Sequence, residues 1–465
     1  MTRVLASVSS ALGAAGTGCL VACVVTGLLL LPRAAAAQHE GHGGAAPGPG
    51  SESPERAAPH ANMGMASPPL GIPASREGSG TSWLPDESPM YMLGWQAGPW
   101  ELDAMWNAFL QYLHDGSSRG ESQLGSVNWV MGMARRPLGA AQIRARAMLS
   151  LEPLTVKRCG YPDLLATGET CRAAPLHDRQ HPHDMLMELS AGYAHPVSSA
   201  VALDLYAALS GEPALGPVAF PHRISAMPTP IAPMTHHWLD STHISFGVVT
   251  AGVYGRRWKL EGSAFNGREP DEHRYDLDLA PLDSFSGRIW LLPDAHWSLQ
   301  VSAGFLREAE AGIAGAPRTD VTRTTASATH HRALGRGGTW ATTAAWGRNA
   351  EHGKGTNALL VESVLDLDER NVLFARIEAA EKSAEALAIS GGNDAVRWVG
   401  KAALSYVRQL PIELGPGREI LVGLGAGVSV NAVPSAFEMA YGSRWPLGFS
   451  LFLNTRPGRM EMSAR

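Results

Sequence analysis

Two stretches of this 465-residue chain are rich in histidine and aspartate, which are common ligands of transition-metal ions. The candidate ligands are His177, His181, His183 and Asp184 in the first stretch, and His236, His237, Asp240 and His243 in the second. His181 and His183 are two residues apart, so both side chains point to the same side of an extended segment. His236 and Asp240 can complete such a site, which predicts a bound zinc, copper or nickel ion. The alternative interpretation is that these are solvated or ordinarily hydrogen-bonded loop residues.

A second group of candidate ligands lies near the N-terminus, in a segment of Gly, Pro, Ala and Ser that cannot bury a core. Its candidate ligands are His39, His42, His60, Met63 and Met65. Imidazole and thioether together suit copper, and thioethers favour Cu(I). The alternative is that a low-complexity tail contains these residues by chance.

Residue patterns for catalysis are weak, so we expect no enzyme. The Gly-x-Ser-x-Gly string from Gly116 to Gly120 lies between two predicted strands, whereas a nucleophile elbow needs a strand-to-helix turn. Asp240, Ser241 and His243 contain the residue types of a hydrolase triad, but adjacency in sequence does not establish its geometry.

The N-terminus has the composition of a secretory signal peptide, with one early basic residue, an apolar run to Leu31 and small residues up to Ala37. We expect a signal peptide over 1–37 and a disordered tail over 38–99. A lipidated Cys23 after Leu20-Val21-Ala22 is the rival interpretation. The remaining cysteines of an exported chain, Cys159 and Cys171, are expected to form a disulfide.

From residue 100 to 465 the chain alternates apolar and polar residues, as strands with one apolar face do. About 16 such segments are present, near 102–114, 124–134, 142–152, 184–195, 199–209, 243–254, 257–266, 282–292, 297–305, 320–333, 338–349, 356–367, 370–381, 396–409, 418–431 and 447–453. Short and long connections alternate, which is typical of bacterial outer-membrane barrels. The sequence therefore predicts an all-β fold, a closed antiparallel transmembrane β-barrel behind the tail, with the long loops outside the cell.

The connection from Ser210 to Thr242 contains six prolines and cannot form a strand. Since long loops without secondary structure are usually functional, we expect this one to fold inward as a constriction or plug.

Polar faces of the segments carry charges of both signs, which are expected to line the lumen. They include Asp103, Arg144, Arg146, Glu188, Lys259, Glu261, Arg288, Glu362, Arg397 and Lys401. Such charges either guide a solute or form structural ion pairs in a polar interior.

The order of signal peptide, His- and Met-bearing tail and barrel resembles the copper-resistance B type of outer-membrane proteins in Gram-negative metal-resistance systems. The resemblance implies an outer-membrane location with a periplasmic tail, copper as ligand, and periplasmic metal-handling partners. This chain has a sparser tail and more strands, so no functional residues are carried over. We expect a pore or binding protein for metal ions, copper above all, with zinc as the other candidate, or for small polar solutes. The alternative is a general diffusion porin. A net charge of −5 indicates no nucleic-acid partner.

Overall fold

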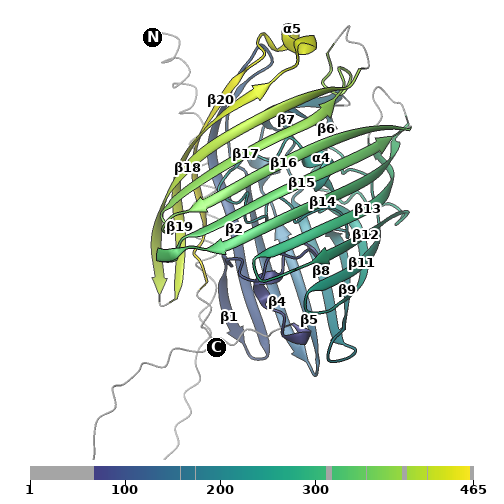
Figure 1. The fold of residues 1–465 in the computed structure, drawn as a ribbon, viewed down its shortest axis with the longest axis vertical. Coiled ribbons are helices and arrows are strands. Elements are labelled where there is room, and N and C mark those ends of the chain that lie inside the picture. Colours follow the sequence, from purple (N-terminus) through teal and green to yellow (C-terminus); the bar gives the residue numbers. More distant parts are fainter. Residues whose placement is uncertain are drawn as a thin grey trace, which may run out of the picture. The chain divides into compact units, whose positions relative to one another are not determined.

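The computed structural model describes residues 68–460 except 158, 173, 311–316, 352, 390–394 and 416. Sixteen antiparallel strands form a closed barrel, in which each strand pairs with the next and the last pairs with the first (Figure 1). They are β2 (Trp100–Gly116), β4 (Asn128–Leu138), β5 (Ala141–Leu149), β8 (Leu186–Pro196), β9 (Ala202–Gly211), β10 (Ser245–Tyr254), β11 (Trp258–Phe265), β12 (Ser284–Leu291), β13 (Trp297–Glu310), β14 (Thr319–Ala333), β15 (Thr339–Glu351), β16 (Lys354–Asp366), β17 (Asn371–Lys382), β18 (Arg397–Gly415), β19 (Arg418–Ala432) and β20 (Leu447–Pro457). All sixteen coincide with predicted segments.

The outer face of the barrel is apolar and its inner face is polar. On β12, Ile289 is 49% exposed on the outside, whereas its neighbour Arg288 is fully buried on the inside. An apolar outer band suits lipid, and closure of the sheet pairs the backbone groups that lipid cannot satisfy. The fold is therefore a transmembrane β-barrel. Within the described part of the chain, no helix is long and apolar enough to cross a membrane.

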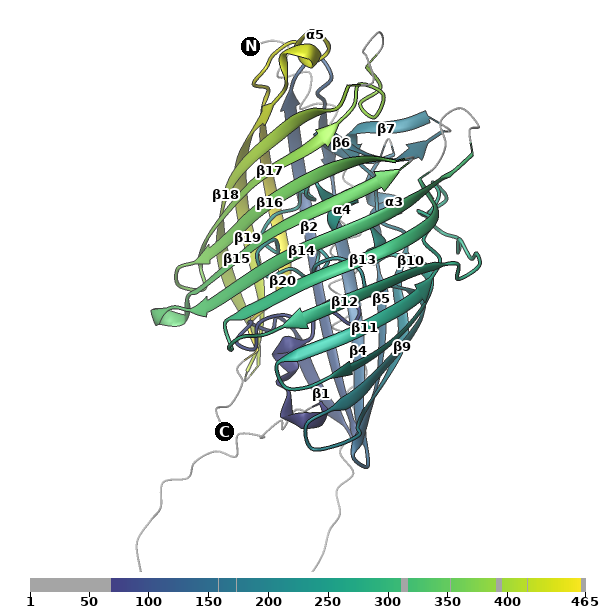
Figure 2. The same ribbon diagram turned by 45° about the vertical axis from the view of Figure 1, so that its right-hand side comes forward.

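Short turns join the strands at one end of the barrel and long segments join them at the other. The long-loop end carries β6 (Tyr161–Cys171), β7 (Ala174–Gln180) and the short helix α5 (Glu438–Tyr441) (Figures 1 and 2). The expected disulfide is present and joins Cys159, just before β6, to Cys171, the last residue of β6 next to the hairpin turn. This hairpin was not predicted, because its residues do not alternate in polarity.

The connection between β9 and β10 folds into the lumen, as predicted for a plug. It contains the short helices α4 (His236–Leu239) and η4 (Ser241–His243), and most of its residues are buried. Wall side chains bind its backbone: the Ser263 hydroxyl accepts from the Ala214 N–H at 2.7 Å, and Asn349 donates to the His237 carbonyl at 3.0 Å. These bonds replace the strand pairing that the prolines prevent.

An N-terminal segment also fills the lumen, which corrects the predicted tail boundary at residue 99. Residues 68–92 include the short helices η2 (Pro69–Gly71) and η3 (Ala74–Arg76), and β1 (Leu93–Ala97) pairs with β2. Lys259 donates to the Thr81 carbonyl at 2.8 Å, and Ser298 donates to the Trp83 carbonyl at 2.9 Å. The segment is buried because its few apolar side chains and its backbone bind the wall.

A further strand, β3 (Ser122–Gly125), pairs with the end of β2.

The predicted signal peptide and the candidate tail ligands His39, His42, His60, Met63 and Met65 lie outside the described residues.

Candidate metal site in the lumen

Five histidine side chains meet inside the barrel, near its long-loop end. They are His181 and His183, which follow β7, His236 and His237 on α4, and His243 on η4. Neighbouring rings lie close together: His236 is 5.1 Å from His243, and His181 is 5.6 Å from His237, measured between ring centroids. All five residues are buried except His243, which is half-buried. The structure thus brings together five of the eight residues expected to bind metal in these two stretches.

Each of the five rings has its Nδ1 atom beside an oxygen acceptor. Nδ1 of His183 lies 2.9 Å from Glu152, that of His236 lies 2.8 Å from Asp240, and that of His237 lies 2.8 Å from Glu269. Nδ1 of His181 lies 3.1 Å from Glu169. His243 completes the set, with Nδ1 2.8 Å from the Asp240 carbonyl.

This arrangement fixes the tautomer of the imidazoles. A neutral ring carries one proton, and an oxygen acceptor beside Nδ1 favours the tautomer in which Nδ1–H donates to that oxygen. The lone pair of the ring then lies on Nε2. The Nε2 atoms of His181, His237 and His243 are buried and have no hydrogen-bond partner in the structure. A histidine that binds a metal through one nitrogen normally donates its other N–H to a carboxylate or carbonyl. The five rings have such an acceptor beside Nδ1.

Burial and charge act on these rings in different ways. Burial lowers the pKa of His236 to about 4, and it lowers the pKa of His181 and His243 well below the usual range. Burial would also lower the pKa of His183 and His237, but Glu152 and Glu269 outweigh it and raise both values.

Buried ion pairs hold the plug that carries three of these histidines. Arg223 of the plug is fully buried and donates to Asp240 at 2.8 Å, and it also pairs with Glu362 on β16. Asp240 uses its other oxygen for His236, so both carboxylate oxygens bind protein donors. Asp240 therefore orients the ring of His236.

The backbone of β6 comes close to the cluster at Gly168, which has a φ of 123°. A Cβ atom at this position would lie 2.1 Å from the ring of His237. Glycine is required here because the strand passes directly against the imidazole.

The two other expected ligands, His177 and Asp184, are occupied by other protein groups. His177 lies on β7, where its Nδ1 is 2.6 Å from Arg119 and 3.0 Å from Asp178. One oxygen of Asp184 accepts from Arg274 at 3.3 Å. Sequence reasoning missed Glu152 and Glu169, which lie in the connection between β5 and β8, and Glu269, which lies between β11 and β12; none of them carries a pattern that links it to the histidines.

The five rings are not gathered around one point. Among the described residues, groups whose ligand atoms all lie within 4.8 Å of one another are found only at Asp271, Asp276 and Asp278 and at the disulfide with Glu272. Neighbouring rings of the cluster, such as His236 and His243 or His181 and His236, have centroids 5.1–6.1 Å apart, so binding one ion requires the imidazoles to rotate toward each other.

Nine of the ten predicted lumen charges point inward, and most form ion pairs. Lys259 lies between Asp204 and Glu261, at 2.8 and 3.0 Å, and Arg288 binds Glu261 at 2.8 Å. Arg397 is the exception. It lies on the same face of β18 as Lys401, but it is exposed because it is the first residue of the strand. Structural pairing thus accounts for most of these charges.

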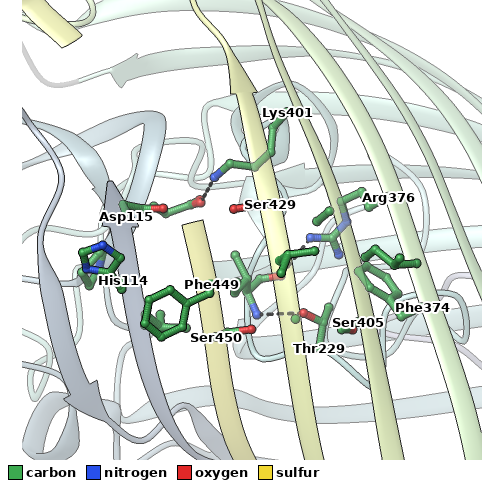
Figure 3. Close-up of a pocket in the computed structure, with 18 of the residues that line it drawn as sticks. His114, Asp115, Thr229, Phe374, Arg376, Lys401, Ser405, Ser429, Phe449 and Ser450 are labelled. Atoms are coloured by element: carbon green, nitrogen blue, oxygen red, sulfur yellow. Dashed lines mark hydrogen bonds and ion pairs between the residues drawn. The ribbon is translucent and has the colours of Figure 1, made fainter. Parts of the chain in front are cut away.

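A small cavity of about 30 Å³ remains beside β17 and β18 (Figure 3). Lys401 pairs there with Asp163, and Arg376, Glu378 and Ser405 line the same cavity. It is a space between the wall and the inward-folded segments.

The residues expected for a hydrolase do not form a triad in the described structure. The Asp240 carboxylate binds His236 and Arg223, whereas His243 contacts the Asp240 carbonyl. Ser241 accepts from Arg323 at 2.9 Å. In the Gly-x-Ser-x-Gly string, Ser117 and Ser118 donate to carbonyls of α5, so these serines have structural roles.

No family model matches the chain, and no curated protein matches its sequence. Among solved structures, it is similar to OmpF of Salmonella typhi in complex with daunomycin, at 8% identity over 78% of this chain and 100% of that one, with a TM-score of 0.46. It is similar to OprB of Pseudomonas putida at 10% identity over 76% and 93% of the chains, with a TM-score of 0.45. The anion-selective porin of Comamonas acidovorans gives 9% identity over 77% and 99%, with a TM-score of 0.42. At such low identity, the function must be inferred from the residues of this chain.

Proposed function

We propose that this protein is an outer-membrane barrel that binds a transition-metal ion at the five-histidine cluster, with copper as the favoured ion and zinc as the other candidate. The observation that carries the proposal is the shared orientation of the rings. Five imidazoles have Nδ1 against an oxygen acceptor, and three of them have a buried Nε2 without a partner. Imidazole is a ligand for both copper and zinc.

The proposed placement in the membrane follows from the barrel. The long loops face the outside of the cell, and the short turns and the N-terminal tail face the periplasm. The cluster then lies near the external mouth, where it can take up an ion from the medium.

The test is calorimetry of the detergent-solubilised full chain with Cu²⁺ and with Zn²⁺. We expect the double variant His181→Ala/His183→Ala to bind at least about tenfold more weakly, since two ligands are lost. His330→Ala is the matched control, because His330 packs on Trp297 on the outer face. Equal affinity of the parent and the double variant would remove the proposal, provided that both show the same heat-modifiable gel mobility.

A general diffusion porin is the second candidate, and the lumen cavities are the observation that favours it. Planar-bilayer recordings separate the two functions. A porin conducts steadily whether or not Cu²⁺ is present, whereas the plugged binding protein conducts little and keeps its metal affinity.

A further inference from the structure

A second cluster of soft metal ligands lies in the lumen, in a region that the histidine site does not include. Three methionines, Met105 on β2, Met131 on β4 and Met148 on β5, are direct cross-strand partners in two successive pairs. The side chains of Met131 and Met148 are buried on the inner face, and Met105 packs against the same cluster. The result is a row of thioethers across three adjacent strands of the wall.

The segments inside the barrel bring further thioethers to this row. A cavity of about 60 Å³ is lined by Met90 and Met92 of the N-terminal segment, Met227 of the plug, and Met105, Met131 and Met133 of the wall. With Met148 and Met187, eight of the 16 methionines of the chain lie here. A closely packed core would more often use Leu, Ile or Val, but these sulfur-bearing side chains border an open space.

The imidazole of His222 contacts one of these sulfur atoms. Nε2 of His222 lies 3.4 Å from Sδ of Met148, and the His222 ring lies 4.8 Å from that of Trp129. Thioether sulfur with one imidazole is a ligand set that selects Cu(I) over harder ions.

The nearby charges leave room for a cation. Arg135 and Arg146 line the cavity, but they pair with carboxylates: Arg135 with Asp103, and Arg146 with Glu77 at 3.3 Å and Glu188 at 4.0 Å. The carboxylates of this network are at least as numerous as the arginines, so the cavity is not positively charged.

A smaller cavity is lined by residues of both this region and the histidine cluster. It measures about 20 Å³, and its lining includes Met148, Met187, His222 and also His243. One residue of the histidine cluster, His243, therefore lies at the same cavity as the ligands Met148, Met187 and His222.

We propose that the methionine-lined chamber formed by Met105, Met131, Met148 and their neighbours, with His222, is a separate site for Cu(I). Binding there does not depend on the proposed metal site at the five histidines. His243 of the histidine cluster and His222 of the chamber line the same small cavity, so the two proposed sites are neighbours in the lumen.

The test uses Ag⁺, a monovalent soft ion without redox chemistry, and Cu⁺ under anaerobic conditions in competition with a chelator. We expect Met105→Leu/Met131→Leu/Met148→Leu to lower Ag⁺ and Cu⁺ affinity at least about tenfold, while Zn²⁺ binding is unchanged. Leucine conserves most of the volume, so the wall remains packed. Met439→Leu is the control, because Met439 is 96% exposed on α5.

The outcome pattern distinguishes the two sites. If the triple variant binds Ag⁺ and Cu⁺ as tightly as the parent, the chamber site is wrong, whatever happens at the histidines. If the triple variant loses Ag⁺ while His181→Ala/His183→Ala retains Zn²⁺ and Cu²⁺ affinity, the chamber stands and the histidine proposal fails. A His222→Phe variant tests the imidazole separately, and it should weaken Cu⁺ binding with little effect on Zn²⁺.

Discussion

At the scale of single residues, the second contact of each histidine determines what the cluster can do. A carboxylate or carbonyl at Nδ1 holds the ring in place and leaves Nε2 as the free donor atom. The sequence indicated the histidines, since they are dense and closely spaced. It did not indicate Glu152 or Glu269, because a single glutamate about 30 residues away along the chain has no pattern to distinguish it. The supporting contacts are visible only when the fold brings these segments together.

Gly168 offers a test of the cluster that leaves all its polar groups unchanged. We expect Gly168→Ala to weaken Zn²⁺ and Cu²⁺ binding, because the new Cβ would displace the ring of His237 and a φ of 123° strains alanine. Gly132→Ala is the control, since no atom lies within 4 Å of a Cβ built there. Calorimetry on both variants decides, and unchanged affinity in Gly168→Ala would show that His237 has no part in binding.

Arg223 tests the anchoring of the plug. Its removal leaves Asp240 and Glu362 as buried carboxylates without their main cation, so we expect Arg223→Ala to cost about 3–5 kcal/mol. The temperature at which the folded band disappears in heat-modifiable electrophoresis should fall clearly. Arg397→Ala, at an exposed position, should leave this temperature almost unchanged. A similar small effect in both variants would contradict the role given to Arg223.

At the scale of elements, the barrel strands were predictable and the inward-folded segments were predictable only in part. Alternation revealed all sixteen strands, because each has one face toward lipid and one toward a polar interior. The plug could be expected from its prolines and length. Residues 68–92 could not be recognised, since their burial depends on wall residues such as Lys259 and Ser298 that bind their backbone.

The disulfide between Cys159 and Cys171 constrains the β6–β7 hairpin, which contacts His181 and His237. β6 carries Gly168 and Glu169, which contact His237 and His181. We expect Cys159→Ser/Cys171→Ser to keep the barrel but to bind Zn²⁺ several-fold more weakly, since the hairpin becomes less ordered. Calorimetry together with circular dichroism checks this expectation, and parent-like affinity in a parent-like barrel would contradict it.

At the scale of the whole molecule, two segments that are distant in sequence share the lumen and contact each other. The Ala219 N–H of the plug donates to Ser79 of the N-terminal segment at 2.9 Å. Ion pairs between wall charges further occupy the interior. A barrel of this width thus holds a folded interior with separate cavities, which suits binding of a small ion better than free diffusion of solutes.

Single-channel conductance measures directly whether the filled lumen blocks the passage of solutes. We expect the parent to show little single-channel conductance in planar bilayers. A variant with residues 213–235 replaced by a short Gly-Ser linker should conduct, because the space beside β14–β17 becomes accessible to water. Equal, large conductance of both proteins would show that the inward-folded segments do not block the barrel.

X-ray absorption at the metal edge shows whether imidazoles in the lumen hold a metal ion. The full chain is loaded with Zn²⁺, freed of excess metal and measured. We expect one retained ion with several imidazole nitrogens at about 2.0–2.1 Å, and a weaker nitrogen signal in His181→Ala/His183→Ala. A shell of oxygen atoms alone, or no ion retained, would contradict this expectation.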